Sequence, residues 1–123
     1  MSNFTWTPIT SDEIKWALID FDKTVANNTG FPNYFPLEPM SDAVEYLNKI
    51  NDLGYKITIF TARPWADYSN LEKWCKHYKI PVRRIICGKP LGRFFIDDLA
   101  ISYRGDWKET YTALISFLEE TKK

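Results

Sequence analysis

The chain has 123 residues, of which 45% are hydrophobic and 26% charged, and its 16 basic and 16 acidic residues leave no net charge. This size predicts one compact domain over residues 1–123 with a core that needs no disulfides. The neutral balance disfavours nucleic acid as a partner. With two cysteines, no visible signal peptide and no apolar run of membrane length, we expect a cytoplasmic protein without a membrane partner.

The first part of the chain predicts an arm, a strand and a loop. Residues 1–14 contain scattered aromatics, and we expect this arm to lie on a core that spans 15–120. Residues 15–20 form a short apolar run flanked by aromatics, which is typical of a buried strand. Residues 25–39 contain three prolines, which argue against a helix and indicate a loop or tight flap.

A helix is predicted over 41–53. Ser41 is a suitable N-cap residue, and Val44, Leu47 and Ile50 recur at helical spacing. Gly54 would end this helix in the usual way.

The remaining elements alternate between strands and helices. The sequence predicts strands at 55–60, 82–87 and 93–96, a helix at 66–79, and a last helix that begins near Trp107. Strands that alternate with helices of this length predict β-α-β units and a parallel sheet, and so an α/β fold.

Every predicted strand is followed by a polar group. These groups are Asp20 and Asp22, Thr61, Lys89, and the pair Asp97 and Asp98. The carboxyl ends of parallel strands meet at one edge of the sheet, where ligands bind. Carboxylates there suit a hard ion such as Mg²⁺, and a hydroxyl with an ammonium group suits a phosphoryl group.

In this order, the motifs resemble those of the haloacid dehalogenase-like phosphatase superfamily. The matching segments are Asp20-Phe21-Asp22-Lys23-Thr24, Thr61-Ala62-Arg63, Gly88-Lys89-Pro90 and Ile96-Asp97-Asp98. The resemblance covers about 15–120 and implies a three-layer, Rossmann-like sandwich with a central, mostly parallel sheet. Lys23 departs from the pattern, because the family most often has glycine there, and it adds a cation at the mouth of the site.

The resemblance also implies a mechanism. Asp20 attacks phosphorus and forms an aspartyl-phosphate, and Asp22 protonates the leaving oxygen and then activates water. Thr61 donates a hydrogen bond to a phosphoryl oxygen, while Lys89 neutralises the nucleophile and the phosphate.

The implied cofactor is Mg²⁺. Its implied ligands are the Asp20 carboxylate, the backbone carbonyl of Asp22, and Asp98. Adjacent side chains on a strand point in opposite directions, so only one of Asp97 and Asp98 is expected to ligate the ion directly. This alternation does not say which one; we favour Asp98 as the ligand, directly or through a water, and Asp97 as the partner of Lys89. Thr24 is expected to orient the loop that follows the first strand.

Many relatives carry a cap domain over the site, but residues 24–41 and 61–89 leave no room for one. This chain therefore resembles the small, capless type. An open site would accept a large substrate, borrow a lid from a second subunit in a homo-oligomer, or use its own aromatics, including Tyr34 and Trp65. Lys23 and Arg63 are further candidates for substrate contacts, although Arg63 is equally typical of a salt bridge.

The sequence thus favours a Mg²⁺-dependent phosphatase that acts on a small phosphorylated substrate, a phosphosugar or a nucleotide. A polynucleotide-end phosphatase is an alternative that suits an open site but finds no support in the neutral charge. A signalling receiver domain is disfavoured, because its acidic pair comes first in the chain and its acceptor aspartate in the middle. A non-catalytic phosphate-binding module is disfavoured by the complete set of polar residues.

Overall fold

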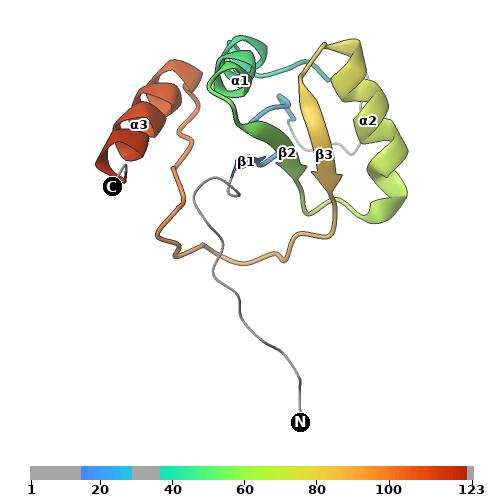
Figure 1. Cartoon of the computed structure of the whole chain (residues 1–123). Helices are drawn as coiled ribbons and strands as arrows, with labels where there is room; N and C mark the ends of the chain where they lie inside the picture. The colour runs from blue at the N-terminus through green and yellow to red at the C-terminus, as the bar shows by residue number, and fades with distance from the viewer. Residues whose placement is uncertain (1–14, 29–36, 122–123) are drawn as a thin grey trace, which may run out of the picture.

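The computed structural model describes residues 15–28 and 37–121 (Figure 1). Its elements in chain order are β1 (Trp16–Ile19), α1 (Ala43–Asp52), β2 (Lys56–Phe60), the 3-10 turn η1 (Trp65–Asp67), α2 (Tyr68–His77), β3 (Val82–Ile86) and α3 (Trp107–Glu120). The arm over 1–14 and the part of the flap that contains Tyr34 lie outside the described residues.

The three strands form a parallel sheet in the order β1-β2-β3. Ile19 pairs with Ile59, and Ile59 pairs with Ile85, so the strands end side by side. Helices flank the sheet: α2 packs on β3, and α1 packs on β2 and on α3, which places α1 between the other two helices in Figure 1. The predicted α/β class with a parallel sheet is confirmed, and the part of the chain that the structure describes has no cap.

The core lies between the sheet and its helices. Ile57 and Ile59 of β2 are fully buried, and so are Leu47 of α1 and Leu71 and Trp74 of α2. β2 is the central strand, and Thr58, which lies between these two isoleucines and points to the opposite face, is also fully buried. This packing fixes where each strand ends, and therefore where the polar residues that follow it lie.

The start of α1 differs from the prediction. Asp42, rather than Ser41, is the N-cap residue, and its backbone has a φ of 67° with no hydrogen bond from its side chain. The prediction from Ser41, a residue type that often caps helices, therefore placed the start of this helix one position too early. The end of the helix agrees with the prediction, since Gly54 follows it with a φ of 102°.

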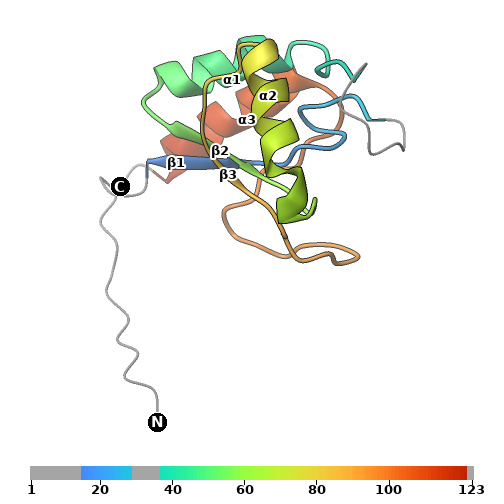
Figure 2. The same cartoon turned by 90° about the vertical axis from the view of Figure 1, so that its right-hand side faces the viewer.

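The predicted fourth strand at 93–96 is wrong. Residues 90–106, which we call the strap, run from the turn after β3 to α3 without forming a helix or a strand, and they project beyond the carboxyl ends of the sheet (Figure 2). Leu91, Phe94, Phe95, Ile96 and Leu99 are each at least 61% exposed there. A strand needs a neighbour to pair with, and a short apolar run does not specify that neighbour.

No helix in the described ranges has the length and apolar character to cross a membrane.

Candidate active site

Asp20 directly follows β1 at the carboxyl edge of the sheet. One carboxylate oxygen, Oδ1, lies 3.8 Å from Lys89 Nζ, and the other, Oδ2, accepts a hydrogen bond from Thr24 Oγ1 at 3.2 Å. The Asp20 side chain remains 43% exposed. The structure therefore brings together three residues that the sequence singled out, and it leaves their carboxylate open to a ligand.

Backbone hydrogen bonds hold the loop after β1. The carbonyl of Phe21 accepts from the N–H groups of Thr24, Val25 and Ala26, and Lys23 N–H donates to Ala26 O at 2.9 Å. Lys23 has a φ of 66°, the left-handed conformation that glycine adopts without cost. This backbone accounts for the glycine that is usual at this position of the motif.

The far end of the chain also reaches this loop. The indole Nε1 of Trp107, at the start of α3, donates to the carbonyl of Thr24 at 2.9 Å. Asp106 caps the same helix by accepting from the backbone N–H groups of Lys108 and Glu109. The capped helix end therefore supports the loop that carries Asp20.

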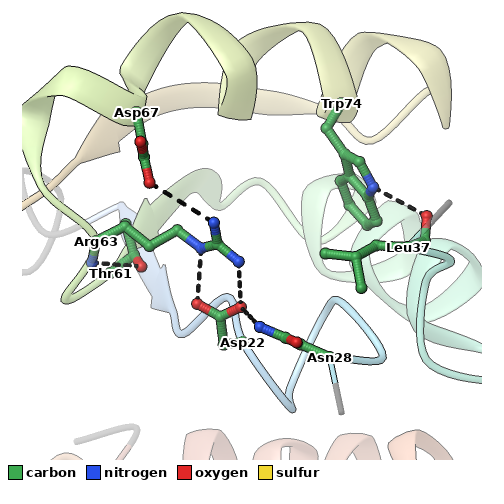
Figure 3. Close-up of polar contacts among 7 residues, drawn as sticks. All are labelled: Asp22, Asn28, Leu37, Thr61, Arg63, Asp67 and Trp74. Carbon is green, nitrogen blue, oxygen red and sulfur yellow. Dashed lines mark hydrogen bonds and ion pairs between the residues drawn. The ribbon is translucent and has the colours of Figure 1, made fainter. Parts of the chain in front are cut away.

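Asp22 is bound by a buried arginine. Arg63 is 8% exposed, and it donates from Nε to Asp22 Oδ2 at 2.9 Å and from Nη2 to Asp22 Oδ1 at 2.7 Å. Asn28 Nδ2 donates to the same Oδ1 at 2.6 Å, and Asp67 lies 3.6 Å from Arg63 Nη1 (Figure 3). A bidentate arginine–carboxylate pair of this kind is strong and fixes the orientation of both groups.

This pairing controls the charge of Asp22. Burial alone raises the pKa of the Asp22 carboxyl, but the hydrogen bonds from Arg63 and Asn28, together with the charge of Arg63, lower the pKa below its usual value. Asp22 is therefore ionised at neutral pH in this arrangement. An ionised carboxylate can accept a proton but has none to donate, and the lowered pKa makes it a weaker base than an ordinary aspartate.

Backbone bonds join the ends of β2 and β3. Lys89 N–H donates to Thr61 O at 2.9 Å, and Gly88 N–H donates to Arg63 O at 2.8 Å. Gly88 has a φ of 75°, so this turn favours glycine. These bonds hold the backbone from which Lys89 reaches Asp20.

Thr61 is 1% exposed, and its Oγ1 accepts a hydrogen bond from Arg63 N–H at 3.2 Å. In this position the hydroxyl group organises the exit loop of β2. The hydroxyl group is the acceptor in this bond, so its own proton is not used by it; the predicted donation to a phosphoryl oxygen would have to be made from a buried side chain.

The structure does not bring the acidic pair to the other site residues. Asp97 and Asp98 lie on the exposed strap, and Asp97 Oδ1 accepts from Leu99 N–H at 2.8 Å. The ion pair that the structure gives Lys89 is with Asp20, so the pairing expected between Lys89 and Asp97 is not present. Asp97 and Asp98 were expected at the edge of the sheet because a strand at 93–96 would have ended there. Residues 93–96 do not form that strand, so the expected position of the pair is wrong as well.

The described residues offer a limited set of ligands for Mg²⁺. No three acidic, histidine or cysteine side chains among them gather into a metal site. Mg²⁺ keeps several waters and is commonly bound through one or two carboxylates. The half-exposed Asp20 carboxylate, with the backbone carbonyl of Asp22, fits a site of that kind.

The sequence indicates one of the two partners of Asp22. Arg63 is typical of either a salt bridge or a substrate contact, and the structure shows the salt bridge. The available signal was its place two residues after Thr61, at the exit of the neighbouring strand. Asn28 carried no such signal, because it lies in a loop whose path depends on tertiary contacts.

Both cysteines are buried and form no disulfide. Burial raises the pKa of the Cys75 thiol to about 12. Burial, and then the charge of Asp67, raise the pKa of Cys87, which directly follows β3. Neither thiol has the lowered pKa of a catalytic nucleophile.

Comparison with known proteins bears on the fold. The chain is similar to the crystal structure of a target protein from Vibrio cholerae, with a TM-score of 0.65 and 27% sequence identity. The alignment covers 89% of this chain and 99% of that chain. No protein-family model and no curated protein matches the chain. The likeness supports the α/β architecture, and the description of the relative gives no activity.

Proposed function

We propose that this chain is a phosphomonoester hydrolase in which Asp20 is the nucleophile. The observation that carries the proposal is the setting of Asp20. Its carboxylate is open to solvent at the carboxyl edge of a parallel sheet, beside the Lys89 ammonium group and the Thr24 hydroxyl group. This edge is where ligands bind in open parallel sheets.

The reaction would proceed in two displacements. An oxygen of Asp20 attacks phosphorus, and the bond between phosphorus and the leaving oxygen breaks, which gives an aspartyl-phosphate and an alcohol. Water then attacks the same phosphorus, releases inorganic phosphate and restores the Asp20 carboxylate. Lys89 offsets the charge on the phosphoryl oxygens in both steps.

Asp22 is the proposed acid and base, and its pairing with Arg63 restricts when it acts. The leaving oxygen needs a proton, which an ionised Asp22 does not hold. A bound phosphoryl group would attract Arg63 and weaken its bond to Asp22, which would raise the pKa of Asp22 toward its usual value. In the second step an ionised Asp22 accepts a proton from the attacking water.

Mg²⁺ is the proposed cofactor, and it would supply positive charge next to the phosphoryl oxygens. Asp20 and the Asp22 carbonyl would hold it. Asp98 is proposed as a further ligand, because both ends of the strap are tied to the site: Lys89 pairs with Asp20, and Trp107 bonds to Thr24. In the sequence, Asp98 lies halfway between Lys89 and Trp107, so the strap is long enough for Asp98 to reach the site.

Hydrolysis of a generic aryl phosphate tests the proposal. The wild-type protein should release phosphate with Mg²⁺ and stop when EDTA is added. Asp20→Asn should lower kcat at least about 1,000-fold, because it removes the nucleophile. Asp52→Asn, at the exposed end of α1, is the matched control and should keep full activity. Full activity in Asp20→Asn would exclude Asp20 as the nucleophile.

Asp98→Asn tests the metal assignment separately. It should raise the Mg²⁺ concentration needed for half-maximal activity about tenfold, which is the lower end of the loss typical of a perturbed metal site. Asp97→Asn is its neighbour control. An unchanged Mg²⁺ requirement in Asp98→Asn would remove Asp98 from the ligand set.

A further inference from the structure

Trp65 lies against the segment that carries Lys89. It begins η1, directly after the exit loop of β2. A Cβ atom placed on Gly88 would lie 3.5 Å from the indole Nε1 of Trp65, so the ring edge packs on Gly88. Gly88 directly precedes Lys89, whose ammonium group pairs with Asp20. The indole ring therefore lies against the turn from which Lys89 extends.

The indole ring is both exposed and held in place. Trp65 is 58% exposed. Its ring is stacked on that of Tyr68 at an interplanar angle of 18°, with 6.1 Å between the centroids. Tryptophan contributes a large apolar surface when it is buried, so an exposed indole with a fixed orientation is suited to a flat ligand.

The surroundings of Lys89 add to this argument. Lys89 Nζ lies 5.3 Å from the ring centroid of Phe60 and 4.9 Å from that of Phe95. The ammonium group that would meet a phosphate is thus set among aromatic rings. A ligand that fits both features has a phosphate at one end and a planar ring at the other.

We infer that Trp65 is a stacking platform for the base of a nucleoside monophosphate, the ribose spanning from the indole to Asp20 and Lys89. The inference rests on the proposed phosphomonoesterase activity and narrows its substrate class from phosphosugar or nucleotide to nucleotide. Stacking of a base on an aromatic side chain tolerates any base, because every base has a flat face. Trp65 therefore selects for the presence of a base rather than for its identity.

The experiment compares two substrates that differ only in the base, adenosine 5′-monophosphate and ribose 5-phosphate. The wild-type protein should show the higher kcat/KM for the nucleotide. Trp65→Ala should lower kcat/KM for the nucleotide about tenfold, mainly through KM, and leave ribose 5-phosphate within twofold. Trp65→Phe should retain most of the preference. Phe94→Ala, which removes another exposed aromatic ring, should change neither substrate.

Two outcomes would overturn the inference: equal losses on both substrates in Trp65→Ala, or no loss on either. Calorimetric binding of adenosine 5′-monophosphate to the wild-type protein and to Trp65→Ala separates this inference from the proposed activity. Binding that weakens about tenfold in Trp65→Ala supports the platform even where the wild-type protein hydrolyses neither substrate. Binding of equal strength in the two proteins excludes it.

Discussion

The exit edge of the sheet and the strap both carry residues of the four motifs, but they hold them very differently. At the exit edge, Asp20 forms an ion pair with Lys89 and Asp22 accepts hydrogen bonds from Arg63, both partners coming from other segments, and Thr61 is buried. On the strap, Asp97 bonds to a backbone group two residues away. The position of a motif residue is thus well defined only where the backbone that carries it is bonded to the rest of the fold.

The difference originates in strand pairing. β1, β2 and β3 pair as a parallel sheet, with one register shift between Ile57 and Thr58 where β2 meets β3, and that pairing sets the position of the residues that follow each strand. Residues 93–96 have the composition of a strand but have no such partner among the residues that the structure describes. The first two of the following tests change one residue at the edge or core and a matched residue on the strap or surface.

Loss of a cation should have the largest effect on catalysis. Lys89→Met should lower kcat about 100-fold to 1,000-fold, because it removes a charge that stabilises the phosphoryl group. Its effect on the free energy of unfolding should stay below about 1 kcal/mol, since the 3.8 Å pair with Asp20 is partly exposed. Arg93→Met removes an exposed cation from the strap and should leave kcat within twofold. Equal losses of kcat in both variants would contradict a specific role of Lys89 at the phosphoryl group.

Truncation of an isoleucine should lower the free energy of unfolding much more in the core than on the strap. Ile59→Ala leaves a cavity at a fully buried position of β2 and should lower the free energy of unfolding by about 2–5 kcal/mol. Ile96→Ala truncates a side chain that is 91% exposed and should change the free energy of unfolding by less than about 0.5 kcal/mol. Urea unfolding measures both. A large loss in Ile96→Ala would mean that the strap packs in solution.

The smallest expected effect concerns pH and the pair formed by Asp22 and Arg63. The pKa of Asp22 is lowered in the folded protein, so the pair adds stability above the unfolded pKa of about 3.9. This stability is lost as the pH falls through the folded pKa. The wild-type protein should therefore be more stable than Asp22→Asn at pH 7. The difference between their free energies of unfolding should shrink by about 1.5 kcal/mol when the pH is lowered from 7 to below the folded pKa of Asp22. A stability difference for Asp22→Asn that stays constant with pH would contradict the lowered pKa.

The sequence predicted the parts of the fold that depend on periodic patterns. The strand that leads to Asp20 and the helix that ends at Gly54 both follow from spacing and residue type. The α/β class follows from the alternation of strands and helices. The fourth strand was mispredicted because Phe94, Phe95 and Ile96 suit a strand only when a neighbour pairs with them.

The candidate site was predictable to the extent that it lies at strand ends. The proximity of Lys89 to Asp20 follows from the parallel sheet. The bond from Arg63 to Asp22 does not, because it depends on how an arginine side chain crosses between two exit loops, which residue order does not encode. The contact between Trp65 and Gly88 likewise depends on the path of η1.

The bond from Trp107 to Thr24 has a consequence for the order of folding. It joins residues 83 apart in the chain, and such distant contacts form late because the intervening chain must first be brought to order. On a ribosome, β1 and its loop emerge long before Trp107 does. The loop that carries Asp20 is therefore expected to gain its final shape only after the last helix has been made, so this end of the sheet should be the last part of the protein to mature.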